Sequence, residues 1–417
     1  MLLILIQIEQ MFDNGLVVWY NVIIIMRTIL HCDMNNFYAS VEMLLNPSLK
    51  DFPLAVAGNP VKRTGIILAK NYNAKAYGVK TGEAIWEAKL KCPNLVCVSP
   101  HFDEYERYSK MARDIYNKYT DKIEPFGIDE CWLDITESLK YFNKSGIEIA
   151  KDIQDEIYNS LGLTISIGVS FGKTLAKLGS DMKKPKGLVE ITKDNLMPVL
   201  KKLDIADMIF IGKRTAKKLK DMNIYTLYDL VHYNPKILEE TFGVNGKKIY
   251  EMAQGINDDE IVIYTDQDTK SVGNGLTAPK DLITLLDVKK HLSHLADMVS
   301  SRMRRHKFKA KTIHLTIKFA DFSYLGAQKT YTQSFSSREH ILNYALTIFD
   351  ELTGKIFAPI RALRISCSKL EICDSTEQLS FFEDSKKEKL GEALDAIREK
   401  YGDDSIILMG ELEEIWI

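Results

Sequence analysis

The sequence predicts a multidomain α+β protein, and two stretches of the chain carry that prediction. A predicted β-hairpin at 123–134, a helical pattern at 145–161 and a strand at 163–169 place helices on one face of a mostly antiparallel sheet. Residues 270–372 then follow a β-α-β-β-α-β order. With 417 residues, of which 46% are hydrophobic, the chain is long enough to bury several cores.

The chain begins with an apolar but interrupted segment, residues 1–25. Polar residues such as Gln7, Glu9 and Asn21 break the run of about 20 apolar residues that a spanning helix needs. The basic start of a signal peptide is also missing. We therefore expect an upstream extension without a role, and a membrane anchor is the alternative.

Three carboxylates stand in predicted strands rather than in solvated loops. Asp33 ends an apolar stretch that predicts a buried strand, a common place for chemistry. Asp129 and Glu130 lie in the predicted hairpin beside Trp132, where burying adjacent carboxylates is costly unless a cation or hydrogen bonds compensate. Because strand side chains alternate, both acids can face one site only beside a distortion, which Gly127 can supply.

Neighbouring strands of one sheet would bring Asp33 to Asp129 and Glu130. Three acidic ligands with open positions suit Mg²⁺, which completes its shell with waters and substrate phosphates. Two such ions would form the clamp used for in-line phosphoryl displacement. The sequence therefore predicts a magnesium site between these strands.

Two helical patterns flank this region. Tyr72 and Lys75 lie three positions apart on one helix face, from which both could reach a triphosphate, although an ordinary amphipathic face is the alternative. The pattern at 103–119 carries a tyrosine-rich stripe that we interpret as core packing, not as a base-stacking platform.

Two lysine-containing turns follow the strand at 163–169. Gly172-Lys173-Thr174 resembles the end of a phosphate-binding loop, but Ile167 replaces its opening glycine, so ATPase activity is not expected. Lys184 directly precedes Pro185 in a turn that is generically solvated.

Short helical patterns separated by glycine fill residues 200–255. Around Gly212 and Gly243 they resemble helix-hairpin-helix turns, in which helix N-termini bind backbone phosphates without reading sequence. Helix capping is the alternative, and Phe210 stands where glycine is usual. The residues expected to contact a polyanion here are Gly212, Lys213, Gly243, Gly246 and Lys247.

The net charge of −2 hides an uneven distribution. Residues 269–372 hold 17 Lys and Arg against 8 Asp and Glu, whereas 373–417 hold 5 against 13, so a basic module precedes an acidic tail. Such a module suits polyanion binding, in which Arg302, Arg304 and Arg305 are the expected contacts, although a solvated helical face is the alternative. Its predicted elements are a helix at 282–303, strands at 312–319 and 333–336, a helix at 338–353 and a strand at 360–370. The six cysteines show no metal-ligand spacing, which favours reduced thiols in the cytoplasm.

The acidic tail holds the pentapeptide Gln378-Leu379-Ser380-Phe381-Phe382. Two aromatic residues are unusual in a stretch this acidic, because nothing local could bury them. Packing back onto the chain is the alternative to binding a partner. Residues 390–417 predict a helix and a strand without an assigned function.

Two motifs together resemble the Y-family translesion DNA polymerases, in the branch of DinB or DNA polymerase IV, with some UmuC-like features. They are Asp33-Met34-Asn35-Asn36-Phe37-Tyr38-Ala39-Ser40-Val41-Glu42 and Ile128-Asp129-Glu130-Cys131-Trp132-Leu133-Asp134. The resemblance covers about residues 26–382. Gly127 replaces the usual serine, and Asn35 replaces a frequent second acid, but neither change removes an expected ligand.

The resemblance implies template-directed addition of deoxynucleotides to a primer 3′-hydroxyl, at low fidelity, opposite damaged or undamaged DNA. It assigns two Mg²⁺ ions to Asp33, Asp129 and Glu130 as catalytic ligands, with the Met34 carbonyl assisting. It makes Tyr38, next to Phe37, the steric gate against ribose. Triphosphate contacts fall to Tyr72, Lys75 and Lys184, and sliding-clamp binding to Gln378, Leu379, Phe381 and Phe382.

The resemblance also implies a right-hand arrangement. The palm would comprise 26–37 and 103–192, the fingers 38–102, the thumb 193–257 and the little finger 270–372, after a linker at 258–269 and before the tail at 373–417. A cytoplasmic monomer is expected. Two alternatives stay open: another palm-bearing enzyme such as a nucleotidyl cyclase, and a catalytically silent DNA-binding accessory protein recruited by the clamp.

Overall fold

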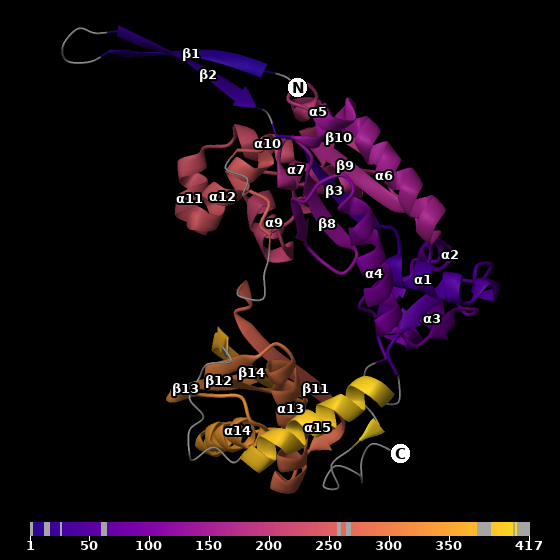
Figure 1. Cartoon of the computed structure of the whole chain (residues 1–417), viewed down its shortest axis with the longest axis vertical. Helices are drawn as coiled ribbons and strands as arrows, with labels where there is room; N and C mark the ends of the chain where they lie inside the picture. Colours follow the sequence, from indigo (N-terminus) through magenta and orange to yellow (C-terminus); the bar gives the residue numbers. More distant parts are fainter. Residues whose placement is uncertain are drawn as a thin grey trace. The chain divides into compact units, whose positions relative to one another are not determined.

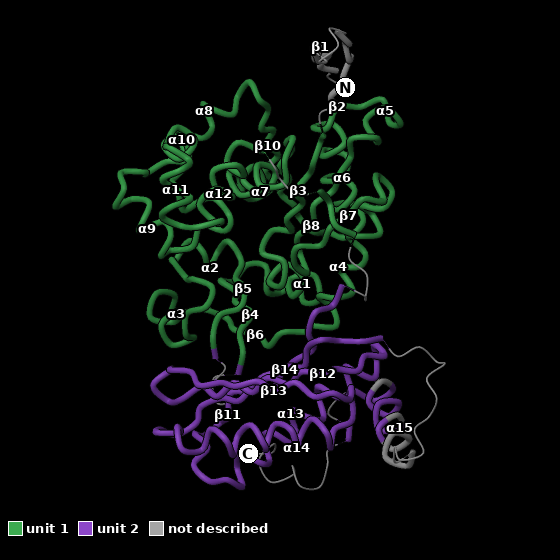
Figure 2. Tube along the Cα trace, turned by 90° about the vertical axis from the view of Figure 1, so that its left-hand side faces the viewer, with its two compact units in different colours: residues 1–58, 66–263 green, residues 59–65, 264–417 purple. Residues whose placement is uncertain are grey.

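The chain forms two compact units, residues 1–58 with 66–263 and residues 59–65 with 264–417 (Figure 2). The computed structural model describes residues 3–11, 17–25, 27–59, 65–256, 260–263, 268–372, 385–402, 405 and 406. The main segment of the second unit begins inside the linker predicted at 258–269. None of the described helices is long and apolar enough to cross a membrane.

The first two strands form a sheet of their own. Strand β1 (Leu3–Met11) pairs antiparallel with β2 (Val17–Ile25), and the register runs from Leu3 opposite Ile25 to Met11 opposite Val17 (Figure 1). The sequence predicted no strands here. That this segment lacks a role stays a prediction.

The central sheet of the first unit has five strands in the order β10-β9-β3-β8-β7. Only β10 and β9 run parallel, so the mostly antiparallel sheet and the predicted hairpin of β7 and β8 are confirmed. The strands are β3 (Ile29–Met34), β7 (Ile123–Pro125), β8 (Glu130–Asp134), β9 (Ile165–Ser170) and β10 (Leu188–Ile191).

Helices cover both faces of this sheet, not one face as the sequence suggested. On one face, Leu30 and Leu133 share a core with α4 (Phe102–Tyr116) and α6 (Gly146–Leu161), the two predicted helices. On the other, Ile29 and Trp132 pack with α7 (Lys173–Met182). The reason is that every residue of β3 is buried, so both faces require a cover.

Helix α7 approaches the sheet backbone to backbone at Gly168. A Cβ atom built there would lie 1.9 Å from the Ala176 carbonyl oxygen and 2.5 Å from the Ser180 nitrogen. Backbone atoms of a helix cannot yield as a flexible side chain can. Gly168 therefore sets the depth at which α7, and every side chain on it, lies against the sheet.

We expect Gly168→Ala to lower the free energy of unfolding by about 3 kcal/mol or more, because the added methyl group overpacks a contact between two backbones. Urea unfolding followed by circular dichroism measures the effect. Gly354→Ala is the matched control, since a Cβ atom there meets nothing within 4 Å. Equal midpoints for both variants would contradict this packing.

A second, smaller sheet follows α1 (Phe37–Leu45) and the short helix η1 (Pro47–Leu49). Its strands lie in the order β5-β4-β6 and were not predicted, because each has at most four residues and too little periodicity. They are β4 (Leu54–Ala57), β5 (Ile67–Lys70) and β6 (Val96–Val98), with α2 (Tyr72–Ala76) and α3 (Ile85–Lys91) between β5 and β6.

Short helices around one apolar core complete the first unit, as the glycine-separated pattern predicted. Gly243 joins α11 to α12 with φ +65°, and Phe210 has φ +67°, the left-handed conformation that glycine favours. Phe210, which stands where glycine is usual, therefore adopts a backbone conformation that glycine favours. The helices are α8 (Leu196–Leu200), η2 (Ile205–Asp207), α9 (Lys213–Asp221), α10 (Leu227–His232), α11 (Pro235–Phe242) and α12 (Val244–Ala253). The short helix α5 (Ser138–Phe142), in the predicted palm, packs Leu139 and Phe142 on the core of the central sheet instead.

The second unit has the predicted β-α-β-β-α-β order. Its antiparallel sheet runs β11-β14-β12-β13, and the two long helices share a core with one face of the sheet. The strand predicted at 333–336 is longer and begins at Tyr324. The elements are β11 (Ser271–Leu282), α13 (Leu285–Arg305), β12 (Phe308–Phe319), β13 (Tyr324–Phe335), α14 (Arg338–Leu352), η4 (Thr353–Lys355) and β14 (Ile360–Ile372).

Helix α15 (Ser385–Tyr401) is tied to α13 by two ion pairs. Arg398 contacts the carboxylate of Asp297 at 2.7 Å, and Arg304 contacts that of Asp395 at 2.7 Å. Asp297 is only 3% exposed, so this pair lies at the interface of the two helices. The helix predicted in 390–417 is confirmed in part, and the predicted strand lies outside the described residues.

Candidate active site

The pairing of β3 with β8 brings the predicted carboxylates together. Asp33 lies directly opposite Glu130 in the register, and the Met34 N–H donates to the Asp129 carbonyl at 3.1 Å. Asp129 precedes the strand, after the turn at Gly127, so it can face the same side as Glu130. The three acids line one cavity of ≈ 350 Å³, together with Met34, Asn36, Phe37, Tyr38, Leu68, Ala69, Lys70, Thr81 and Lys184.

Burial and neighbouring charges shift the pKa values of Asp129 and Glu130 in opposite directions. Burial, with the charges of Asp33 and Glu130, raises the pKa of Asp129 to about 6. Burial also disfavours the charged form of Glu130, but contact with His31 and the charge of Lys177 outweigh it and lower its pKa to about 2. The two adjacent acids therefore differ in pKa because Glu130 has cationic partners that Asp129 lacks to the same degree.

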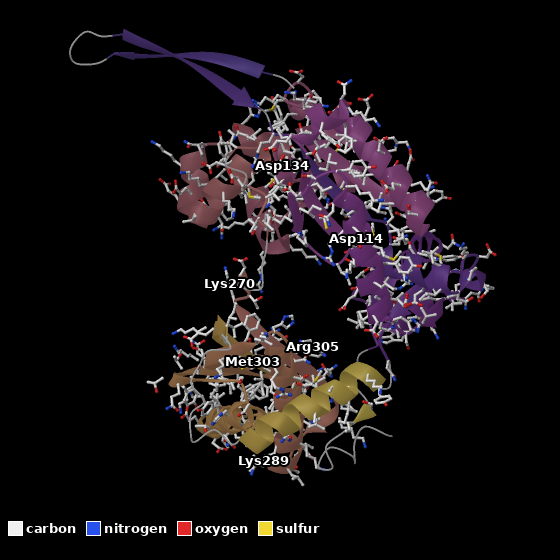
Figure 3. The ribbon with its side chains drawn as sticks, viewed as in Figure 1. Asp114, Asp134, Lys270, Lys289, Met303 and Arg305 are labelled. Carbon is white, nitrogen blue, oxygen red and sulfur yellow. The ribbon has the colours of Figure 1, made fainter. Side chains whose placement is uncertain are left out.

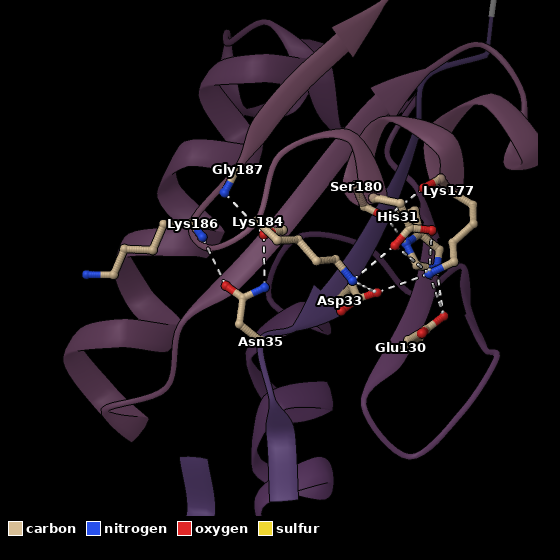
Figure 4. Close-up of polar contacts among 11 residues, drawn as sticks. His31, Asp33, Asn35, Glu130, Lys177, Ser180, Lys184, Lys186 and Gly187 are labelled. Carbon is tan, nitrogen blue, oxygen red and sulfur yellow. Dashed lines mark hydrogen bonds and ion pairs between the residues drawn. The ribbon is translucent and has the colours of Figure 1, made fainter. Parts of the chain in front are cut away.

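Two lysines approach the carboxylates from the α7 side of the sheet (Figure 4). The Lys177 ammonium lies 3.0 Å from Asp33 Oδ2 and 3.1 Å from Glu130 Oε2, and the Lys184 ammonium lies 2.7 Å from Asp33 Oδ2. Lys177 is buried, whereas the Lys184 side chain is 26% exposed. Both also contact Asp181, at 3.2 and 3.0 Å. Lys184 can thus reach a ligand in the cavity, and Lys177 is fixed behind the acids.

Lys177 and His31 are the residues that sequence reasoning missed. His31 is fully buried, its Nδ1 lies 2.8 Å from Ser180 Oγ, and its Nε2 lies 3.4 Å from Glu130 Oε2. Burial keeps the pKa of His31 below its usual value. The available signals were a lysine inside an otherwise buried helix pattern and a histidine inside a buried strand, two positions before Asp33.

Asn35, noted as a departure from the family pattern, holds the loop that carries Lys184. Its Nδ2 donates to Ser166 Oγ at 2.9 Å, and its Oδ1 accepts from the Lys186 N–H at 3.0 Å. Ser166 Oγ in turn accepts from the Gly187 N–H at 3.1 Å. An amide can donate and accept at once, which suits it to fastening this loop beside Asp33.

The donor atoms of the cavity suit a hard divalent cation, although they do not yet form a coordination shell. The carboxylate oxygens that line the cavity are the kind of ligand that Mg²⁺ prefers. Two ammonium groups stand beside the acids as cations would. Within the described ranges, however, no three acidic, histidine or cysteine side chains already surround one point as a coordination shell.

Tyr38 lies in the cavity wall with its ring supported from behind. It stacks on the buried Tyr105 at 4.2 Å between ring centroids, with 11° between the planes, and the Phe102 ring meets it edge-on at 6.0 Å. The tyrosine stripe of α4 is core packing as predicted, and one member also braces Tyr38. A ring held this way cannot swing aside for a larger ligand.

The predicted fingers residues reach the cavity to different extents. Lys70 lines it and donates to Thr81 Oγ1 at 3.0 Å, although the sequence did not single out Lys70. Tyr72 interacts electrostatically with Lys184 and Asp33, and burial raises its pKa. The Lys75 ammonium lies 5.6 Å from the centre of the Tyr72 ring. Neither Tyr72 nor Lys75 is among the residues that line the cavity.

Of the first-unit residues predicted to bind a nucleic-acid backbone, some are exposed and one is required for packing. Gly212 and Gly243 begin α9 and α12 without side-chain caps, and Lys213 and Lys247 are exposed. Gly246 is needed for packing, because a Cβ atom there would lie 2.0 Å from the Leu238 carbonyl oxygen.

The three arginines of the second unit that were predicted to contact a polyanion differ in their partners within the chain. Arg302 donates to the Gly273 carbonyl at 3.2 Å, Arg304 pairs with Asp395, and Arg305 is exposed. Arg304 is thus engaged within the chain. The residues predicted to bind a sliding clamp, Gln378, Leu379, Phe381 and Phe382, lie outside the described residues.

Family models match both units. Residues 32–181 match the impB/mucB/samB family, and residues 269–381 match the impB/mucB/samB family C-terminal domain. The DNA polymerase IV of Acetivibrio thermocellus is 41% identical over 387 residues, covering 90% of this chain and 95% of the relative. That of Bacillus velezensis is 38% identical, covering 91% and 92%.

Solved structures agree with the sequence comparisons. A Y-family DNA polymerase chimera of Dbh and Dpo4 superposes with a TM-score of 0.76 at 26% identity, covering 83% of this chain and all of the chimera. A ternary complex of Dbh, with partially disordered substrates, gives 0.59 at the same identity and coverage. With its paired carboxylates at the cavity and relatives matched over nearly their full length, this chain belongs to the DNA polymerase IV branch of the Y-family translesion DNA polymerases.

Proposed function

We propose that this DNA-directed DNA polymerase performs nucleotidyl transfer in the cavity bounded by Asp33, Asp129 and Glu130. The observation that carries the proposal is the convergence of these three acids from β3 and β8 on one cavity that Lys184 also lines. The primer 3′-hydroxyl attacks the α-phosphate of the deoxynucleotide, and pyrophosphate leaves. Asp33, Asp129 and Glu130 orient the reacting groups, and Tyr38 limits the space beside the sugar.

Two Mg²⁺ ions would be held by these carboxylates and the Met34 carbonyl, and would lower the pKa of the 3′-hydroxyl and neutralise phosphate charge. The raised pKa of Asp129, caused by its burial and by the two neighbouring carboxylates, supports a cation here. Lys177, bound to both Asp33 and Glu130, keeps the acids in place without reaching solvent. Magnesium titration of single-nucleotide primer extension, with chelation as the reverse experiment, tests the proposal.

Lys184 would bind the triphosphate, which it can reach because its side chain is partly exposed. We expect Lys184→Ala to raise KM for the deoxynucleotide about tenfold, with a further loss in kcat, because an ammonium group on the phosphates stabilises both bound substrate and transition state. Steady-state single-nucleotide insertion separates the two parameters. The adjacent, exposed Lys183→Ala is the matched control. Equal KM values in both variants would remove Lys184 from the triphosphate site.

The open face of the second unit's sheet is our proposed main DNA surface. Alternating side chains of β11, β14, β12 and β13 point away from the helices, and Arg364, Lys318 and His314 are among them. Between the Ser271–Ser368 and Lys318–Tyr324 pairs this face holds no acid, and farther along the register Glu371, opposite Lys309, is paired with Lys311. A polyanion suits such a face. The face comprises Ser271, Gly273, Gly275, Thr277, Ala362, Arg364, Ser366, Ser368, Thr312, His314, Thr316, Lys318, Tyr324, Gly326, Gln328 and Thr330.

The remaining predicted DNA contacts are proposals that rest on the exposure of single residues. Arg305 is exposed at the C-terminal end of α13 and can add to DNA binding (Figure 3), as can Lys213 and Lys247 in the first turns of their helices. The division into palm, fingers, thumb and little finger is supported by the separate cores. Docking of Gln378–Phe382 on the sliding clamp, a cytoplasmic location and a monomeric state rest on the sequence alone.

A further inference from the structure

A cluster of exposed aromatic rings lies at one end of the second unit's sheet, where β12 ends, β13 begins and β14 begins. Phe322 is 56% exposed, Tyr324 66% and Phe357 71%. The register joins them, since Lys318 pairs with Tyr324, and Phe319 pairs with Ile360. Three large rings left in solvent at one place are unusual, because each forgoes the free energy of burial.

Two cations lie over these rings. The Lys318 ammonium is 4.8 Å from the centre of the Phe322 ring and 5.2 Å from that of Tyr324, and the Arg361 guanidinium is 4.8 Å from the Phe322 ring. Phe357 packs its ring against Phe319 at 4.6 Å. The cluster therefore presents positive charge and aromatic faces together. We call Lys318, Phe322, Tyr324, Phe357 and Arg361 the aromatic-cation cluster.

The backbone holds Phe322 outward. Its φ of +69° is in the left-handed region, which a bulky residue rarely adopts. The Phe322 N–H donates to the Phe319 carbonyl at 3.0 Å, which closes the turn. The one acid within that turn, Asp321, accepts from the Ser323 N–H at 2.9 Å and from its hydroxyl group, so its charge is engaged locally.

We propose that the aromatic-cation cluster binds single-stranded nucleic acid, with bases stacked on the rings and phosphates held by Lys318 and Arg361. Every base has a stackable face, so this binding is indifferent to sequence. Lys318 and Tyr324 also belong to the open face of the sheet, so the cluster continues the proposed DNA surface. For a polymerase, the strand with this chemistry is the unpaired template, and the inference thus rests on the proposed DNA surface.

A protein partner is the competing occupant. Three aliphatic residues follow β11 at the same end of the sheet: Ile283 is 80% exposed, Leu285 50% and Leu286 62%. Aliphatic side chains offer no stacking face and no charge. The two cations over Phe322 favour a polyanion instead.

The test compares full-length wild type with Phe322→Asn/Phe357→Ser, in which Asn tolerates the positive φ and neither residue belongs to the open face. Fluorescence anisotropy measures binding to a primed template with a single unpaired base and to one with an overhang of about 16 nucleotides. We expect the wild type to bind the long overhang more tightly, and the variant to lose about tenfold on that substrate alone. Tyr141→Ser, which removes an 84% exposed ring from the first unit, should bind both as the wild type does.

Single-nucleotide extension on the short overhang separates this inference from the proposed function. The variant should extend it at the wild-type rate, because the cluster is not part of the cavity. If the wild type does not extend it, the proposed function fails. If it does, and the variant retains the overhang preference, only the cluster assignment fails. A wild type that self-associates through the cluster, with no overhang preference, overturns the inference in favour of a protein partner.

Discussion

Replacement of Asp129 or Glu130 by alanine is expected to lower the rate of nucleotide addition by about 10³-fold or more, equivalent to about 4 kcal/mol of barrier. Both side chains line the cavity, and burial, together with the charges of Asp33 and Glu130, raises the pKa of Asp129. Removal of one leaves too few oxygen ligands for the metal ions. Single-turnover primer extension in Mg²⁺ measures the loss.

The control is Glu137→Ala, which removes an 85% exposed carboxylate that pairs with Lys122 at the surface, at 2.8 Å. Its extension rate should match the wild type. Binding of primed DNA should stay within about twofold for all three variants, because backbone contacts elsewhere supply the affinity. Extension by Asp129→Ala at the wild-type rate would remove this residue from catalysis. A wild type that binds DNA but adds no nucleotide with any metal would favour the accessory-protein alternative.

Replacement of Tyr38 by alanine is expected to raise ribonucleotide insertion relative to deoxynucleotide insertion by about 100-fold, equivalent to about 2.7 kcal/mol of discrimination. The Tyr38 ring lies in the cavity wall and stacks on Tyr105, which is fully buried. The ring therefore cannot yield to a 2′-hydroxyl group. The ratio of kcat/KM for the two nucleotides measures the discrimination.

Two further variants test whether the Tyr38 ring itself causes the discrimination against ribonucleotides. Tyr38→Phe keeps the ring and should keep the discrimination, since the argument is steric and does not use the hydroxyl group. Phe102→Ala removes a ring that touches Tyr38 from outside the cavity and should change the ratio far less. A Tyr38→Ala variant that still excludes ribonucleotides would place the sugar elsewhere in the cavity.

The sequence by itself determined the elements that have strong local signals. The helices at 102–116 and 146–161 have long amphipathic patterns, and Ser145 with Glu148 forms the capping box that starts the second one. The hairpin of β7 and β8 and the β-α-β-β-α-β order were also readable, because alternation and turn residues are local properties. The three acids could be named because charged residues inside apolar strands are rare.

Only the tertiary structure decided what surrounds those acids. Lys177 reaches Asp33 across 144 positions of sequence because Gly168 lets α7 lie directly on the sheet, and no local pattern encodes such an approach. The same holds for Tyr105 behind Tyr38, and for Arg304, which appeared to be a free basic residue but pairs with Asp395. Periodicity fixes which side of an element is buried, whereas the partner it meets depends on how distant elements pack.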